Sequence, residues 1–386
     1  MPDAYILGIE SSCDETAAAV VRSGEQLVSN VVASQIATHQ PYGGVVPELA
    51  SREHLRAIVP VVRQAIAEAK HTYHSVDAIA VTQGPGLAGA LLVGISYAKA
   101  LAFALDKPLI AVNHLEGHIH AVLLEERQKG NHELQFPVLA LVVSGGHTHL
   151  YLAAPKDAAW TYENIGHTRD DAAGEAFDKV AKLLGLGYPG GPVIDRLSSH
   201  GDPNAVKFPP AQIKHRDRRG RMDGRSVNPD EDSPRFDFSY SGIKTAILRH
   251  VEAHSLQLAV EVRRTALARI TRPKLEDYLA HCDKTTLDLI ASFQRAIVED
   301  LVGKTLAAAE ACNVATLFVT GGVAANQELR HTFEREAAMQ GLPVFFPSQT
   351  LSTDNAAMIA AAAYPKFLAK DFAPLDFSAE AGMKLR

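Results

Sequence analysis

Two histidines, His114 and His118, stand four residues apart in a short polar interruption between two apolar runs. The pattern predicts a buried strand followed by a helix, with Asn113 as the N-cap and Glu116 as its capping-box partner. Side chains four residues apart share one helix face, so the two imidazoles could hold a cation together. We expect both rings to be neutral, because the positive end of a helix disfavours imidazolium. From this stretch alone, a pair of partly buried structural histidines is an equally good interpretation.

Two strand–turn–strand segments open the two halves of the sequence, at residues 5–21 and 138–152. Their turns consist of small and polar residues, SSCDET at 11–16 and SGGHT at 144–148. Small residues let backbone N–H groups approach a phosphate closely, so such turns suit nucleotide binding. Either hairpin alone could be purely structural. Their recurrence predicts a duplicated fold with a site shared by two lobes.

Elsewhere, buried strands alternate with amphipathic stretches, which predicts an α/β fold. We expect helices at residues 47–70 and 88–104. The second of these is rich in small residues, a composition that favours close helix packing. That packing could be internal or against a partner protein, and the internal alternative is favoured without further observations.

Two further features lie near the C-terminal end. A predicted strand at 316–320 is followed by Gly321-Gly322 and then by a helix with Asn326 in its first turn. A strand, a glycine turn and a helix N-terminus together suit a bound nucleotide, although glycine pairs also occur in plain turns. Asp354 precedes an alanine-rich helix, where it is a plausible N-cap.

A helix at residues 170–184 carries a stripe of carboxylates that ends at Asp178. Such a stripe is usually a solvated face, with Asp178 and Lys182 forming an ordinary helical ion pair. A rigid glycine–proline turn at 188–192 follows, where the backbone could approach a ligand, and Asp195 lies just inside the next helix.

The composition is that of a soluble globular protein, with 386 residues, 47% of them apolar and 21% charged. This length suits two domains. No apolar run approaches the length of a membrane span, and the chain enters a strand too early for a signal peptide. We therefore expect no membrane association.

Cysteine usage and charge indicate the compartment and the partners. The three cysteines (Cys13, Cys282 and Cys312) form no CxxC pair, which predicts a reducing, cytoplasmic environment. The net charge of −6 means that a nucleic-acid partner needs a local basic patch. Residues 214–225 provide one, although a solvated surface loop is the better interpretation of this run alone.

Taken together, these stretches resemble the TsaD family of tRNA threonylcarbamoyladenosine synthases, formerly described as glycoproteases. The matching stretches occur in the family's order over nearly the whole chain: residues 8–16, 42–51, 84–86, 114–118, 142–148, 170–186, 188–192, 321–326 and 353–355. The resemblance implies an actin/Hsp70/sugar-kinase-like fold with two duplicated lobes around a nucleotide. One lobe would comprise residues 1–136, completed by a C-terminal helix within 355–386. The other would comprise residues 137–354, with insertions near 214–235 and 256–283.

The resemblance also implies roles for particular residues. His114, His118 and Asp354 match the family's metal ligands. Two imidazoles and one carboxylate with open positions suit Fe²⁺, although Zn²⁺ or Mg²⁺ are compatible with these ligand types. The segment that contacts the nucleotide phosphate comprises Val142, Val143, Ser144, Gly145 and Gly146. The ribose and adenine contacts are Asp178, Gly191, Asp195 and Asn326.

The implied reaction transfers the threonylcarbamoyl group from threonylcarbamoyl-AMP to N6 of the adenosine at position 37 of tRNAs that read ANN codons. Asp14, and after it Glu15, is our candidate for the group that takes or positions the N6 proton; turn structure and capping explain both residues equally well. The implied partners are tRNA, TsaB-like and TsaE-like helper proteins, and a separate synthase that supplies the donor.

Three alternatives compete with this reaction. An ATPase or small-molecule kinase of the same fold would need the nucleotide turns but not His114, His118 and Asp354 together. A metalloprotease is disfavoured because the HExxH motif places its glutamate next to the first histidine, whereas Glu116 is two residues along. A non-catalytic scaffold would not need the set of metal ligands.

Overall fold

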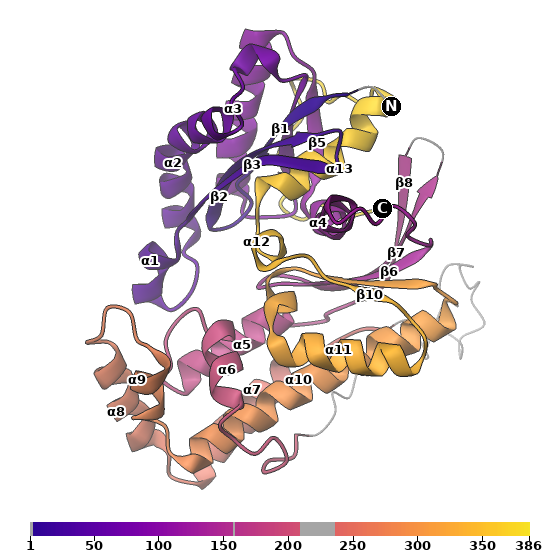
Figure 1. Cartoon of the computed structure of the whole chain (residues 1–386). Helices are drawn as coiled ribbons and strands as arrows, with labels where there is room; N and C mark the ends of the chain where they lie inside the picture. The colour runs from indigo at the N-terminus through magenta and orange to yellow at the C-terminus, as the bar shows by residue number, and fades with distance from the viewer. Residues whose placement is uncertain (1–2, 157–158, 209–235) are drawn as a thin grey trace, which may run out of the picture.

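The structure, a computed structural model, describes residues 3–156, 159–208 and 236–386 and contains two five-stranded sheets (Figure 1). The first has the order β3-β2-β1-β4-β5 and the second the order β10-β9-β6-β7-β8. In each, the opening strand pairs antiparallel with the next strand and parallel with a later one. The strands are β1 Tyr5–Glu10, β2 Glu15–Arg22, β3 Gln26–Ser34, β4 Ala78–Gly84, β5 Leu109–Asn113, β6 Val138–Val143, β7 Thr148–Lys156, β8 Ala159–His167, β9 Thr316–Thr320 and β10 Val344–Phe345. The predicted α/β class and its duplication are confirmed.

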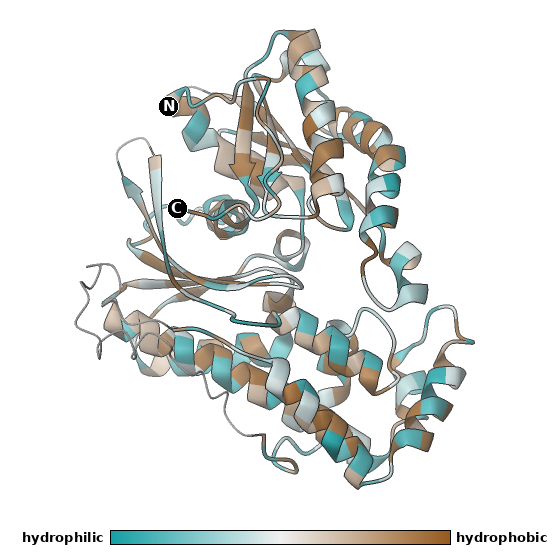
Figure 2. Ribbon diagram, turned by 180° about the vertical axis from the view of Figure 1, so that it is seen from behind, coloured by the Kyte–Doolittle hydropathy of each residue, from teal (hydrophilic) through white to brown (hydrophobic). Residues whose placement is uncertain are grey.

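Helices cover both sheets. They are α1 Ile36–His39, α2 Pro47–Glu68, α3 Ala88–Leu105, α4 His114–Gln128, α5 Ala173–Leu183, α6 Gly191–Ser198, α7 Ser241–Ala253, α8 Gln257–Leu267, α9 Leu275–Leu279, α10 Lys284–Ala311, α11 Gln327–Met339, α12 Gln349–Ser352 and α13 Ala356–Ala369. The strands of the first sheet are mainly brown in Figure 2, as expected for a sheet buried on both faces.

The alanine-rich helix α13 returns from the end of the chain to pack on the first sheet (Figure 1). Its small side chains permit a very close approach to β1. A Cβ atom added at Gly8 would lie 2.3 Å from the carbonyl oxygen of Ala356, so only glycine fits there. This contact fixes the start of α13, and with it Asp354, relative to the first sheet.

Helix α4 lies between the two sheets (Figure 1). One side of it packs against α13. The other side, which includes Leu115, Ile119 and Val122, forms a core cluster with strands of the second sheet and with Leu385. A helix held on both sides is a rigid support for catalytic or metal-binding side chains.

Several sequence expectations need correction. Helix α5 begins at Ala173 rather than at residue 170, because the Asp170 carboxylate accepts hydrogen bonds from Ser239 and Ser241 and from the backbone N–H of Tyr240. Strands β3 and β8 were not predicted. The basic stretch 214–225 and the whole of the predicted insertion at 214–235 lie outside the described residues.

By length and composition, α3 could cross a membrane, which contradicts the expectation that no apolar stretch approaches that length. In this fold α3 packs against α2 and β4.

Candidate metal and nucleotide site

The start of α4 has the predicted cap. The Asn113 side chain accepts the Leu115 N–H at 2.9 Å, and the Glu116 carboxylate accepts the backbone N–H of Asn113. Glu116 points away from the histidines and accepts a hydrogen bond from Tyr162. The rings of His114 and His118 lie edge to face with their centroids 4.7 Å apart. Both side chains are buried.

Asp354 joins the two histidines from the far end of the sequence. Its Oδ1 lies 3.2 Å from His118 Nε2 and 3.6 Å from His114 Nε2. One potential ligand atom from each residue lies within 4.8 Å of the others. The N-cap of α13 is Asn355, whose side chain accepts the Met358 N–H, so the Asp354 carboxylate is not needed as a cap. The capping explanation of Asp354 is therefore wrong.

The two histidines differ in their electrostatic environment. Burial acts to lower the pKa of His114, but the carboxylates of Asp354 and Glu10 outweigh it and raise the pKa to about 9. In the absence of a cation the two nearby carboxylates thus favour the protonated ring, whereas the neutral form expected for a ligating His114 stays a prediction. Burial lowers the pKa of His118, as expected. Asp354 is held below its usual pKa despite its burial, because the two imidazoles stabilise its charge.

These three residues fit a metal ion. Among the described residues, neither ring nitrogen of His118 has a hydrogen-bond partner of good geometry. A buried ring with both nitrogens unsatisfied is costly, and a cation bound at Nε2 would satisfy one of them. Two imidazoles and one carboxylate also form a donor set common to transition metals.

Two residues near this set were not singled out in the sequence. Glu10, the last residue of β1, lies with its Oε2 3.0 Å from His114 Nδ1. A lone carboxylate at the end of an apolar strand could have revealed it. His147, in the turn between β6 and β7, has its ring centroid 5.9 Å from that of His114, and burial lowers its pKa to about 3.

The acidic turn after β1 carries two carboxylates, Asp14 and Glu15, near Asp178, one of the predicted nucleotide contacts. Asp14 is buried. The pKa of Glu15 is raised well above its usual value by burial and by the nearby Asp14. Asp14 also contributes to raising the pKa values of Asp178 and Tyr188, so these two residues lie near the turn. Two adjacent carboxylates of this kind compete to remain ionised, and one of them is then well suited to hold a proton.

The predicted phosphate segment ends β6 and forms the following turn. Val142 and Val143 are buried in the strand, and Ser144 donates its N–H to the carbonyl of His147. Gly145 and Gly146 are exposed, and a Cβ atom added at either would meet nothing within 4 Å. The same holds for Gly191 and Gly322. These glycines therefore leave space in which a ligand could lie against the backbone.

Asp178 stands apart from the rest of its carboxylate stripe. Asp171, which precedes α5, and Glu175, within it, both pair with Lys179 of α5. Asp178 instead accepts the backbone N–H of Gly190 at 2.7 Å, while Lys182 donates to the carbonyl of Tyr42. The predicted ion pair between Asp178 and Lys182 is thus wrong. Burial raises the pKa of Asp178 to about 6, despite the hydrogen bonds from Gly190 and Gly191.

Asp195 and Asn326 are joined by a buried glutamine that sequence reasoning missed. Gln294 donates to Asp195 at 3.3 Å and accepts from Asn326 Nδ2 at 2.8 Å. Asn326 is the N-cap of α11 rather than a residue of its first turn, and it accepts the Leu329 N–H. Gln294 lies in a long amphipathic helix and carries no signal in the sequence that distinguishes it from an ordinary core-facing residue.

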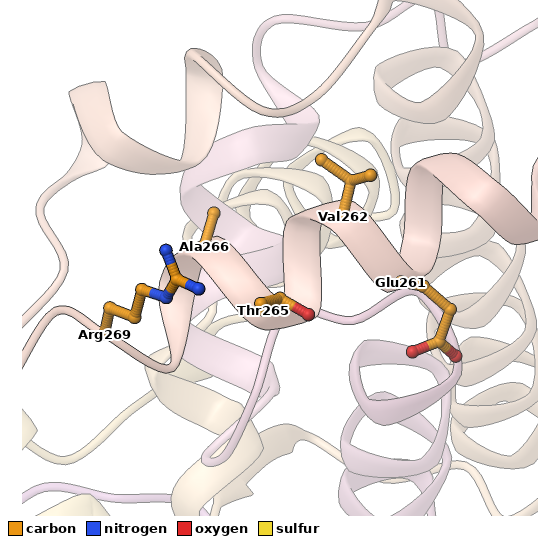
Figure 3. Close-up of a pocket in the computed structure, with 5 residues that line it drawn as sticks. All are labelled: Glu261, Val262, Thr265, Ala266 and Arg269. Carbon is orange, nitrogen blue, oxygen red and sulfur yellow. The ribbon is translucent and has the colours of Figure 1, made fainter.

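Two hollows lie outside these residues. One, of about 370 Å³, is formed by α8 and the turn after it (Figure 3), with Glu261, Val262, Thr265, Ala266 and Arg269 around it. The other, of about 620 Å³, lies on the side of α4 away from the two histidines, where Glu116, Trp160, Lys366 and the C-terminal residues line it. Neither includes His114, His118 or Asp354.

The two duplicated five-stranded sheets with their helices give the chain a fold of the actin, Hsp70 and sugar-kinase type. The chain belongs to the TsaD family, tRNA N6-adenosine threonylcarbamoyltransferase, whose model matches residues 26–361.

Two relatives agree with this assignment, and one solved structure shares the fold. A tRNA N6-adenosine threonylcarbamoyltransferase from Koribacter versatilis (strain Ellin345) is 70% identical over the full length of both chains. Another from Syntrophobacter fumaroxidans (strain DSM 10017 / MPOB) is 52% identical over 97% of this chain and 98% of its own. The fold resembles full-length HypF in its phosphate- and nucleotide-bound form, with a TM-score of 0.53 and 14% identity, over 96% of this chain and 56% of that one.

Proposed function

We propose that this chain transfers the threonylcarbamoyl group of threonylcarbamoyl-AMP to N6 of the adenosine at position 37 of tRNA. The chain is a transferase of the TsaD family and acts in tRNA modification. The observation that carries the proposal is the convergence of His114, His118 and Asp354 beside the turn between β6 and β7. A kinase or ATPase of this fold has no need of that set, so the kinase alternative is not favoured.

We assign the metal to His114, His118 and Asp354, and Fe²⁺ is the ion that these ligands suit best, with Zn²⁺ or Mg²⁺ as alternatives. A bound divalent ion supplies Lewis acidity at the carbonyl or carbamoyl oxygens of the donor. The open glycine positions at 145 and 146 support a phosphate beside Ser144, where backbone N–H groups could stabilise its charge. Asp178, Gly191, Asp195 and Asn326 are assigned to the ribose and adenine, and Val142 and Val143 to the strand that leads into the phosphate turn.

We assign the acceptance of the N6 proton to Asp14 or Glu15. An exocyclic amine is a weak nucleophile, because its lone pair is delocalised into the purine ring. A carboxylate that removes the proton as the new N–C bond forms lowers this barrier. A carboxyl whose pKa is raised well above its usual value tends to keep its own proton, so Glu15 remains the second candidate after Asp14. Single-turnover transfer by Asp14→Asn and Glu15→Gln distinguishes the two, and near-normal rates in both would remove this role.

The target adenosine has to leave its stacked position in the anticodon loop to reach groups that lie between the lobes. We assign residues 1–136 and 355–386 to one lobe and residues 137–354 to the other. A base-paired or stacked adenosine would present N6 to neither Asp14 nor the donor, so loop nucleotides are the suitable substrate.

The proposed partners are a TsaB-like and a TsaE-like helper protein and a separate synthase for the donor, all in the cytoplasm. Helices α2 and α3 pack against each other and expose large apolar side chains, including Leu55, Val59, Leu92 and Phe103. Such a surface is typical of a protein interface. We assign it to the TsaB-like helper.

The test is mass spectrometry of tRNA nucleosides after incubation of the protein with tRNA, threonylcarbamoyl-AMP and helpers. We expect the threonylcarbamoylated adenosine to form, and a chelator or Asp354→Ala to abolish it. Glu116→Gln is the matched control, because it neutralises a buried carboxylate on the metal helix that faces away from the ligands. Full activity of Asp354→Ala, or phosphorylation of a small molecule without tRNA, would overturn the proposal.

A further inference from the structure

Glu10 is a fully buried carboxylate on β1, the central strand of the first sheet. It is the last residue of the otherwise apolar strand β1. It is not among the residues predicted to bind the metal or the substrate. A buried charge is costly unless several donors surround it. Its retention at this position therefore calls for an explanation from its partners.

Three donors hold this carboxylate. The backbone N–H of Ser12 donates to Oε1 at 2.5 Å, and the Thr82 hydroxyl donates to Oε2 at 2.8 Å. Thr82 lies on β4, the parallel neighbour of β1, so the sheet itself sets this contact. The third donor is Nδ1–H of His114, 3.0 Å from Oε2. The Ser12 N–H and the Thr82 hydroxyl thus fix the carboxylate so that its Oε2 faces His114, a candidate metal ligand.

The contact determines which nitrogen of His114 is available. With the proton on Nδ1 shared with Glu10, Nε2 carries the lone pair, and Nε2 is the atom that faces Asp354. The Ser12 hydroxyl oxygen lies 3.2 Å from the same Nδ1 and can supplement this hydrogen bond. His118 has no comparable support among the described residues. Carboxylates that orient a ligating histidine in this way fix its tautomer and raise its basicity.

The charge balance agrees with this role. Asp354 alone would give two neutral imidazoles and one negative charge around a cation. With Glu10 included, the set carries two negative charges, which balance the charge of a divalent ion in a buried site. We propose that Glu10 is a positioning residue for the metal centre: it orients His114 through Nδ1–H and supplies the second negative charge without binding the ion itself. This inference rests on the proposed metal site.

The test is metal affinity rather than catalysis. Apo-protein is titrated with Zn²⁺ and Co²⁺ in competition with a chromophoric chelator, and the visible absorption of bound Co²⁺ reports the ligand geometry. We expect Glu10→Gln, which is nearly isosteric, to weaken binding roughly 10- to 100-fold and to shift the Co²⁺ spectrum. Thr82→Val should also weaken metal binding, but by a smaller factor. It removes the hydroxyl that holds Glu10 Oε2 in position for His114. Glu116→Gln should bind within about threefold of the wild-type protein.

His118→Ala and Asp354→Ala test the metal site itself, separately from the role of Glu10. If both bind metal as tightly as the wild type, the metal site itself is wrong. If both lose affinity while a folded Glu10→Gln retains wild-type affinity and spectrum, the role of Glu10 is wrong. Thermal melting of each variant establishes that it is folded. Should Glu10→Gln fail to fold, Thr82→Val decides instead, and unchanged metal affinity in that variant would overturn the inference.

Discussion

Asn355, and not its neighbour Asp354, caps helix α13. The Asn355 side chain accepts the Met358 N–H at 3.0 Å and donates to the carbonyls of Leu351 and Thr353. Asp354 is thereby held one residue before the N-cap, with its carboxylate beside His118. The two residues therefore have separate roles: the Asn355 amide caps the start of the helix, and the Asp354 carboxylate is free to face the two histidines.

This division predicts opposite phenotypes for two adjacent substitutions. Asn355→Ala removes a buried cap and leaves backbone groups unpaired, so the free energy of unfolding should fall by about 1 to 2 kcal/mol. Asp354→Asn leaves the cap intact but removes the charge that the two imidazoles stabilise, so metal binding should be lost while the start of α13 stays formed. Denaturant unfolding and metal titration of both variants check this. Metal affinity equal to that of the wild type in Asp354→Asn would contradict the division.

Asp178 should make the protein less stable as the pH rises. Its pKa in the folded protein is about 6, above the ordinary 3.8, so the folded state binds this proton more tightly than the unfolded state does. Its contribution is therefore most favourable below pH 4 and is lost as the pH rises from 4 to 6. Each unit of pKa shift corresponds to about 1.4 kcal/mol, so the loss at neutral pH is on the order of 2 to 3 kcal/mol.

The variant Asp178→Asn tests this, because its amide oxygen can still accept the Gly190 N–H. We expect it to be more stable than the wild type at pH 7, by roughly 1 to 3 kcal/mol, and to lose that advantage near pH 4. Its affinity for AMP should fall about 10-fold or more, because a charged acceptor for the ribose hydroxyls is gone. Urea unfolding at several pH values and AMP titration measure the two effects. A stability difference that does not change with pH would refute the explanation by burial.

Much of the fold followed from local patterns. Strand β1 has the predicted bounds, and the recurring hairpins correspond to β1–β2 and β6–β7. Strands β3 and β8 were missed because each has mixed burial and packs by pairing with the preceding strand. Periodicity reveals one buried face, but it does not reveal an edge strand whose partner decides its conformation.

The site residues that belong to local sequence motifs could be predicted, whereas those brought in by tertiary packing could not. The spacing of His114 and His118 gave a shared helix face, but only the fold brings Asp354 to them. Glu10 and Gln294 act through partners more than 30 residues away, namely His114 and Asp195 among others. A single buried polar residue produces no periodic pattern in the sequence. Its hydrogen-bond partners are therefore known only from the folded structure.

Gln294 should support nucleotide binding without touching the nucleotide. In Gln294→Leu, Asn326 loses an acceptor and Asp195 loses a donor, so we expect about 1 to 3 kcal/mol of destabilisation. AMP affinity should fall roughly 5- to 30-fold, because both predicted contact residues lose a fixed orientation. The neighbouring Arg295→Ala is the control, since it alters only exposed polar contacts. AMP affinity equal to that of the wild type in folded Gln294→Leu would remove this role.

Arg263 should determine the stability of the 256–283 segment without affecting the metal centre. This fully buried guanidinium on α8 donates to the carbonyls of Leu184 and His281 and to the Thr286 hydroxyl. It thereby ties the segment to α5 and α10, so the segment is integrated in the lobe. Arg263→Met leaves several buried acceptors unpaired and should cost about 3 kcal/mol or more.

The adjacent Arg264→Met removes an exposed pair with Glu261 and should cost less than about 1 kcal/mol. Thermal and urea unfolding of the two variants measure the contrast, and Zn²⁺ titration of the folded proteins should give affinities within about threefold of the wild type. If the free energy of metal binding fell by as much as the free energy of unfolding in Arg263→Met, the 256–283 segment would be coupled to the proposed metal centre. Its role would then extend beyond the packing around α5 and α10.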